Sequence, residues 1–248
     1  MNEGNMDTVI DLGSSKVKIS TFDQKKKIIS YFSEKIDDRE NIEEISNIIK
    51  KLIKYSEKEI SNHIEDINLI FDHQNFSTID ISIKKNIDHI KSPGELMFDA
   101  KQECTQIINS CYKDQRIIQS FISSIKLDKI ELKKIPKDLK DYSDIIFEFK
   151  LLCISVENFS YLKSIFSKNN LEIKNTFCSS VVRSFNYMNN FKNEKSIAFL
   201  DIGFLRSTLV LFKNSNLQLI NNIPIGGQSI TKDISYMMKI DIKDSEEI

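Results

Sequence analysis

The sequence is poor in the residues that mark several common protein classes. Its 248 residues include four cysteines, three histidines, six glycines, three prolines and no tryptophan. The histidines are isolated, so we do not expect a structural zinc site, which needs four ligands in close pairs. The cysteines form no C-x-x-C pair, and we expect them to be reduced thiols in the core; they are Cys104, Cys111, Cys153 and Cys178.

The sequence also lacks an excess of charge of one sign and a long apolar run. Its 35 Lys and Arg residues against 36 Asp and Glu residues leave a formal net charge of −1. This balance argues against a dedicated nucleic-acid-binding protein. No apolar run approaches the roughly 18–20 residues that span a bilayer, and the polar start does not resemble a secretory signal. We therefore expect a cytoplasmic protein with no nucleic-acid partner.

Two regions of the sequence share one pattern. In the first, an apolar strand at 9–13 ends in Asp11-Leu12-Gly13 and is followed by two more extended segments. In the second, an apolar strand at 197–203 ends in Asp201-Ile202-Gly203 and is also followed by two extended segments. The copies lie about 190 residues apart and predict an internal duplication of one antiparallel three-stranded unit. The flanking segments are 16–22 and 27–32 in the first copy, and 207–212 and 217–223 in the second.

The region between the two copies has a different organisation. Apolar residues at helical spacing predict helices, and shorter apolar or alternating runs predict strands. The order strand, helix, two strands and helix over 79–168 indicates a small α+β module inserted into an α/β protein. The expected helices are 42–53, 96–112, 157–168 and 179–188, and the expected strands are 67–71, 79–83, 116–127, 145–156 and 173–177.

A turn that opens with Asp-x-Gly after a strand is chemically suited to a phosphate. Gly13 lacks a Cβ, so backbone N–H groups can point at phosphate oxygens, and Ser14 and Ser15 add hydroxyl donors. Asp11 can hold a hydrated Mg²⁺ ion. A single turn of this kind is also ordinary turn chemistry. Two copies in duplicated halves favour a pair of hairpins that clamp one nucleotide from both sides.

These motifs resemble the actin-like ATPase superfamily and, within it, the FtsA family of bacterial cell-division proteins. Asp11 to Lys16 (DLGSSK) is similar to the first phosphate motif of that family, and 201–203 lies where the second belongs. The segment IPIGGQSITKDI at 223–234 is the most similar stretch.

The resemblance implies an α/β, actin-like (ribonuclease-H-like) fold with an inserted small α+β module. A first actin-like domain would comprise 7–79 and 169–192, and an FtsA-type (SHS2) subdomain would occupy 80–168. Residues 195–248 would begin a second, incomplete actin-like domain.

The resemblance also implies ATP with Mg²⁺ as the ligand. Asp11 would hold the metal through water, and Asp11 and Asp201 are the candidate catalytic residues. The residues expected to bind the nucleotide phosphates are Gly13, Ser14, Ser15, Lys16, Gly203, Arg206, Ser207, Gly226 and Gly227.

The second phosphate motif departs from the family pattern, which is rich in Gly and Thr. Here Gly203 is followed by Phe204, Leu205 and Arg206. One interpretation is that the bulky residues pack and degrade the site. If their φ is positive, their side chains also strain the backbone. The other is that Arg206 supplies a cation that replaces the lost N–H donors. At most a weak ATPase is expected.

The function implied by the resemblance is an adaptor that links the FtsZ ring to the cytoplasmic membrane. It would bind FtsZ and other division proteins, self-associate into filaments and lie at the inner face of the membrane at the division site. Membrane contact and the adenosine-binding part would lie beyond Ile248, so the chain is expected to be truncated and to bind nucleotide weakly. The alternatives are a PilM-like pilus-assembly adaptor or another actin-like ATPase.

Overall fold

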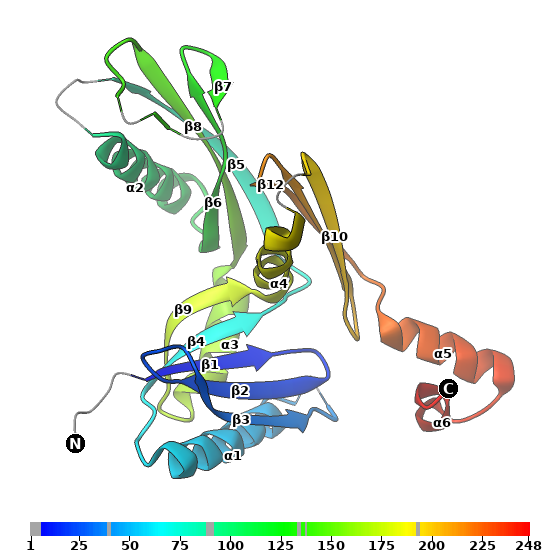
Figure 1. Cartoon of the computed structure of the whole chain (residues 1–248). Helices are drawn as coiled ribbons and strands as arrows, with labels where there is room; N and C mark the ends of the chain where they lie inside the picture. The colour runs from blue at the N-terminus through cyan, green and yellow to red at the C-terminus, as the bar shows by residue number, and fades with distance from the viewer. Residues whose placement is uncertain (1–5, 39–40, 88–91, 133–134, 137, 192–193) are drawn as a thin grey trace.

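The computed structural model describes residues 6–38, 41–87, 92–132, 135–136, 138–191 and 194–248, and places them in three sheets with flanking helices (Figure 1). The expected domain boundary at residue 192 lies outside the described residues. The chain is an α/β protein, as the sequence predicts.

The first sheet has five strands in the order β3-β2-β1-β4-β9. β1 to β3 are antiparallel, whereas β4 and β9 are parallel to β1. The antiparallel part confirms the predicted three-stranded unit, and the parallel part brings the ends of β1 and β4 to one edge. The strands are β1 (Asp7–Leu12), β2 (Lys16–Phe22), β3 (Ile28–Lys35), β4 (Asp66–Phe71) and β9 (Glu172–Cys178).

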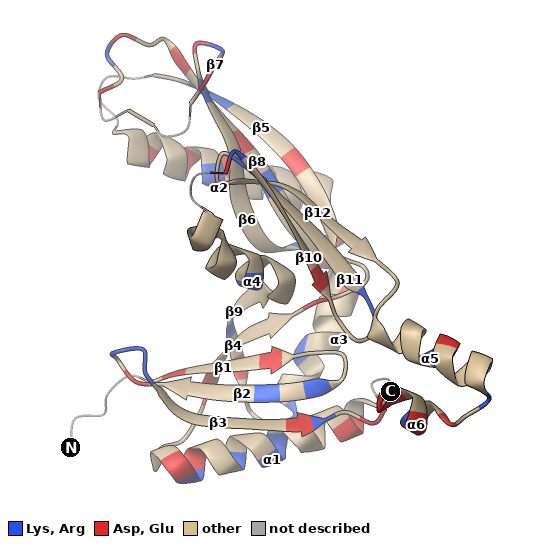
Figure 2. Cartoon of the chain, turned by 45° about the vertical axis from the view of Figure 1, so that its right-hand side comes forward, with Lys and Arg blue, Asp and Glu red and all other residues tan. Residues whose placement is uncertain are grey.

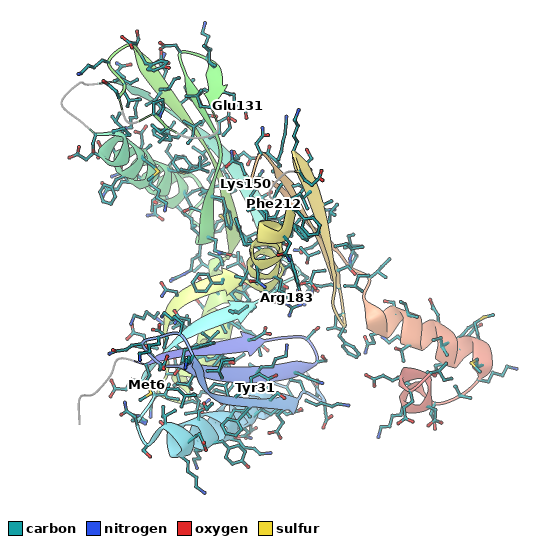
Figure 3. The ribbon with its side chains drawn as sticks, in the orientation of Figure 1. Met6, Tyr31, Glu131, Lys150, Arg183 and Phe212 are labelled. Atoms are coloured by element: carbon teal, nitrogen blue, oxygen red, sulfur yellow. The ribbon has the colours of Figure 1, made fainter. Side chains whose placement is uncertain are left out.

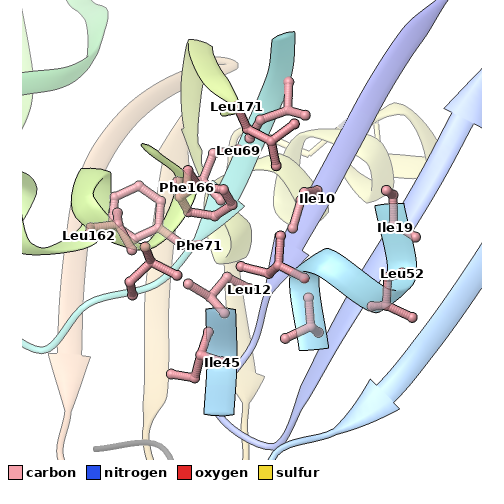
Figure 4. Close-up of a cluster of buried hydrophobic side chains, with 14 of the residues drawn as sticks. Ile10, Leu12, Ile19, Ile45, Leu52, Leu69, Phe71, Leu162, Phe166 and Leu171 are labelled. Carbon is pink, nitrogen blue, oxygen red and sulfur yellow. The ribbon is translucent and has the colours of Figure 1, made fainter. Parts of the chain in front are cut away.

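Two helices, α1 (Ile42–Ile60) and α3 (Val156–Ser167), pack against this sheet. Alternate strand residues such as Ile10, Ile19 and Leu69 are buried and meet the apolar stripes of the helices, as Figure 4 shows. The α1 stripe follows helical spacing, and the Asn41 Oδ1 atom caps its start by accepting hydrogen bonds from the backbone of Glu43 and Glu44.

The segment from residue 77 to 155 builds a separate four-stranded antiparallel sheet in the order β5-β8-β6-β7. Helix α2 (Pro93–Cys111) packs on it and begins with a reciprocal capping box between Ser92 and Glu95. The strands are β5 (Ser77–Asn86), β6 (Gln115–Leu127), β7 (Ile130–Leu132) and β8 (Asp144–Ser155).

The third sheet contains the second three-stranded unit, with the antiparallel order β10-β11-β12. Helix α4 (Ser179–Met188) and the short η1 (Asn189–Phe191) lead into it, and Phe185 of α4 packs edge-on against Phe212, which Figure 3 labels. The strands are β10 (Ser196–Ile202), β11 (Ser207–Lys213) and β12 (Asn216–Ile223), followed by α5 (Gly227–Met238) and α6 (Ile242–Glu246). The two copies of the duplicated unit therefore lie in different sheets.

The predicted helices and strands are all present, with small differences at their ends. β7 and the short last helix α6 were not among these expected elements. Helix α5 was not predicted either, although its sequence carries the closest family motif. No helix in the described part of the chain is long and apolar enough to cross a membrane. Acidic and basic residues are interspersed along the chain (Figure 2).

Candidate functional site

A cavity of about 320 Å³ lies where the two Asp-x-Gly turns come together. The turn after β1 and the turn after β10 form two of its sides, and the end of β4 and the start of α4 form the others. The structure therefore brings together most of the sequence-predicted site residues. Those that line the cavity are Asp11, Gly13, Ser14, Ser15, Lys16, Asp201, Gly203 and Arg206.

The two turns close in the same way. The backbone N–H of Gly13 donates to the Lys16 carbonyl oxygen at 3.0 Å, and that of Gly203 donates to the Arg206 carbonyl oxygen at 2.9 Å. Phe204 and Leu205 do not have positive φ, so the backbone strain considered for these bulky residues does not arise. Phe204 lines the cavity instead.

Arg183, on α4 and labelled in Figure 3, forms ion pairs with both aspartates. Its Nη1 atom is 3.1 Å from both carboxylate oxygens of Asp201, and its Nη2 atom is 3.8 Å from Asp11 Oδ2. Lys18, the cross-strand partner of Asp11, places its Nζ atom 3.1 Å from the same Oδ2 atom. The other oxygen of that carboxylate, Asp11 Oδ1, is buried and has no hydrogen-bond partner among the described residues.

Asp72 follows β4 directly and orders the start of α4. Its carboxylate accepts hydrogen bonds from the Ser180 hydroxyl at 2.8 Å and from the Cys178 thiol at 3.0 Å. Burial, together with the Asp72 charge, holds the pKa of Cys178 well above 9.0. The thiol therefore stays protonated and donates to the carboxylate.

Arg206 is the one cation of the second turn. Its Nη1 atom is buried without a hydrogen-bond partner in the part of the chain that the structure describes. Burial lowers the pKa of this guanidinium, whereas the nearby Asp72 carboxylate acts in the opposite direction. Arg206 lines the cavity, so its guanidinium is a candidate partner for an anion there.

Three predicted phosphate ligands do not line the cavity and instead support the second turn. The backbone N–H of Gly227 donates to the Gly203 carbonyl oxygen at 2.9 Å, and the Ser207 hydroxyl donates to the Ile225 carbonyl oxygen at 2.7 Å. A Cβ atom on Gly226 would lie 2.5 Å from the Arg206 nitrogen. The role of these residues in phosphate binding stays a prediction.

The residues of the cavity suit an anion better than a metal ion. Lys16, Lys18, Arg183 and Arg206 face Asp11, Asp72 and Asp201 around it, so the formal charge has an excess of one positive unit. Lys18, Arg183 and Ser180 engage these carboxylates at every oxygen the structure describes as paired, and only Asp11 Oδ1 among them has no partner. The described residues contain no group of three or more His, Cys, Asp or Glu side chains that could hold a metal. The charge of the cavity therefore suits a phosphate group, and the described residues do not form a metal site by their side chains alone.

Sequence reasoning missed Asp72, Ser180, Arg183 and Lys18. One signal was available for Asp72, because the residue after a strand parallel to β1 lies at the same sheet edge as Asp11. Arg183 carries no comparable local signal, since it reaches the cavity from a helix.

Sequence comparison finds partial similarity to bacterial cell-division proteins. No family model matches the chain. Cell division protein FtsA from Helicobacter pylori J99 is 23% identical over 147 residues, which cover 57% of this chain and 29% of the relative. FtsA from Bacillus subtilis is 37% identical over 59 residues, which cover 23% of this chain and 13% of the relative. The chain thus spans less than a third of the length of these relatives.

Comparison with solved structures shows the fold. The PilM–PilN type IV pilus biogenesis complex superimposes with a TM-score of 0.66 at 12% identity, covering 97% of this chain and 68% of the other. The ethanolamine utilization protein EutJ from Carboxydothermus hydrogenoformans superimposes with a TM-score of 0.53 at 10% identity, covering 98% and 60%. The predicted actin-like α/β fold is confirmed.

Proposed function

We propose that this chain is the phosphate-binding core of an FtsA-like cell-division adaptor. It would bind ATP by its phosphates between the two hairpins, and it would act as a scaffold with weak or absent hydrolysis. One observation carries the proposal: both Asp-x-Gly turns line a single cavity, and Arg206, the cation of the second turn, lines it with them. The partial similarity to FtsA gives the family context.

The residues of the cavity would have different roles in phosphate binding and hydrolysis. Lys16 and Arg206, one from each turn, would contact the phosphate oxygens from opposite sides, and the Ser14 and Ser15 hydroxyls would donate to them. Activation of an attacking water needs a free general base within hydrogen-bond reach. Asp72 already accepts from Ser180 and Cys178, and Asp201 from Arg183. Asp11 is paired at Oδ2 with Lys18 and Arg183, and its Oδ1 atom is the one oxygen of these three carboxylates without a partner among the described residues. We therefore propose binding with little hydrolysis, with Asp11 as the remaining candidate base.

The phosphate site can be tested by ³¹P NMR titration of ATP, which detects weak binding. We expect Arg206→Met to weaken binding about tenfold, the loss of one charge-assisted hydrogen bond of about 1.5 kcal/mol. Arg116→Met is the matched control, because Arg116 lies over the Phe159 ring at 4.0 Å and does not line the cavity. Equal affinity of the Arg206 variant and the parent would refute the site.

The adaptor role concerns partners and location. We propose that the protein links the FtsZ ring to the cytoplasmic membrane, binds other division proteins and self-associates into filaments. A fluorescent fusion in the source organism should form rings at the division site and should co-purify FtsZ. Diffuse fluorescence without FtsZ would contradict this role.

A PilM-like pilus-assembly adaptor is the second candidate. The superposition that covers 97% of this chain favours it, because it includes all three sheets. This candidate predicts co-purification of a pilus-assembly protein in place of FtsZ. The same fusion therefore separates the two candidates.

A further inference from the structure

We infer that Arg183 takes the place of a divalent cation between the two aspartates, so that the site binds phosphates without a metal ion. The inference rests on the proposed phosphate-binding function and deepens it. It differs from the expectation that Asp11 holds Mg²⁺ through water, because Lys18 and Arg183 lie against the Asp11 Oδ2 atom.

The geometry places one guanidinium between carboxylates of two sheets. Arg183 Nη1 lies 3.1 Å from both oxygens of Asp201, and Nη2 lies 3.8 Å from Asp11 Oδ2. Asp11 is the penultimate residue of β1 and Asp201 that of β10, so the two acidic positions of the duplicated motif share a single cation from α4. A metal ion bridging the same carboxylates would have to displace this side chain.

The local charge explains why a metal is unnecessary. Lys18 adds a second cation at Asp11, with its Nζ atom 3.1 Å from Oδ2. Asp11 and Asp201 are thereby compensated, and Lys16 and Arg206 outweigh the remaining Asp72 carboxylate and leave one positive unit for the anion. In a site with uncompensated carboxylates, a divalent cation would have to supply this compensation.

Metal binding without nucleotide gives the first test. Mn²⁺ binding can be followed by electron paramagnetic resonance in the 248-residue chain, in Arg183→Gln and in the control Arg116→Gln. We expect no stoichiometric Mn²⁺ in the parent or the control, and one weakly bound ion in Arg183→Gln, where Asp201 is released and Asp11 keeps only its contact with Lys18. Stoichiometric Mn²⁺ in the parent, or none in folded Arg183→Gln, would overturn the inference.

The second test is the metal dependence of phosphate binding, with inorganic tripolyphosphate as the probe in ³¹P NMR titrations. The parent should bind it with affinities that agree within about threefold in Mg²⁺ and in EDTA. Arg183→Gln should bind at least tenfold more weakly in EDTA and recover in Mg²⁺. Arg183→Lys retains the charge, and it should bind in EDTA to within about threefold of the parent.

The outcomes separate this inference from the proposed function. A parent that binds tripolyphosphate in Mg²⁺ and loses it in EDTA overturns the inference and leaves the phosphate site intact. A parent that binds in neither condition overturns both. If Arg183→Gln does not fold, the parent and Arg183→Lys still decide between these outcomes.

Discussion

Arg206 carries a guanidinium whose Nη1 atom is buried without a partner. Such a group costs stability, and an anion that binds it recovers the cost. We expect Arg206→Met to raise the free energy of unfolding by about 1 kcal/mol, although it weakens phosphate binding. Urea denaturation measures the change. Arg116→Met should lower stability by about 0.5–1 kcal/mol instead, since it loses a cation–π contact. Destabilisation by Arg206→Met would show that its guanidinium has a structural partner in solution.

The four cysteines differ in exposure, whereas the sequence predicted that all of them are buried in the core. Cys104, Cys153 and Cys178 are buried, whereas Cys111 is exposed and corrects the expectation of four core thiols. We expect iodoacetamide at pH 8 to modify Cys111 alone in the native chain, and all four thiols after denaturation. Mass spectrometry of the alkylated peptides checks this. Rapid native labelling of Cys104 would contradict the packing of α2.

The raised pKa values of two buried thiols predict that the stability of the folded chain depends on pH. Burial raises the pKa of Cys104 and Cys153 from 9.0 to about 11. The neutral thiols are therefore favoured in the folded chain, and their contribution is complete below pH 9 and is lost as the pH rises from 9 towards 11. Urea midpoints at pH 8 and pH 10.5 should show this loss. Cys153→Val should reduce it, and an unchanged pH dependence in that variant would contradict the assignment.

Local sequence could reveal only the part of the site that is contiguous. Asp11, Gly13 and Lys16 were predictable because one short turn carries all of them, and the duplicated turn marked Asp201 and Gly203. Arg183 was not predictable from spacing. Its role depends on where α4 lies relative to two sheets, which is a tertiary property.

At the scale of elements, Gly226 fixes the junction between β12 and α5. Its φ of −141° is open to any residue, but a Cβ atom would lie 2.5 Å from both the Arg206 nitrogen and the Phe204 oxygen. We expect Gly226→Ala to push α5 away from the turn, because no residue of α5 is buried to hold it. Amide exchange at Gly227 and Gln228, which donate to that turn, should accelerate at least about tenfold.

Gly94 provides the control for this substitution. It lies in the first turn of α2, and the nearest atom to an added Cβ is the Ser92 Oγ atom at 4.0 Å. Gly94→Ala should be neutral or stabilise the chain by up to about 1 kcal/mol through helix propensity. If Gly226→Ala and Gly94→Ala have the same amide exchange rates and the same stability, close packing around Gly226 is not what requires a glycine at that position.

Most elements were predictable because their apolar periodicity is strong. The stripe of α1 and the alternation of β1 and β2 persist over enough residues to exclude other interpretations. β7 has three residues and two of them are exposed, so no pattern marks it. Helix α5 buries no residue, and its motif indicated a phosphate loop rather than a helix.

At the scale of the whole molecule, the described residues form hydrophobic clusters of unequal size. The cluster under the first sheet contains 20 buried residues, whereas the one that includes the third sheet contains seven. Leu200, Ile202 and Leu219 of the third sheet are exposed. We expect native-state amide exchange to be about 100-fold faster in β10–β12 than in β1 and β4. Equal protection in the two sheets would show that the third sheet is stabilised by something beyond this cluster.

Strand β8 connects these clusters through three consecutive residues. Leu152 belongs to the cluster of the third sheet, Cys153 to that of the inserted module and Ile154 to that of the first sheet. Successive strand residues point to opposite faces. One inserted or deleted residue here would therefore turn the side chains on one side of the change to the other face, and would disturb the packing of all three clusters. We therefore expect β8 to tolerate a change in its length less well than the other described strands. In a library of single-codon insertions and deletions, the folded survivors should be depleted at 151–154 more strongly than within any other strand.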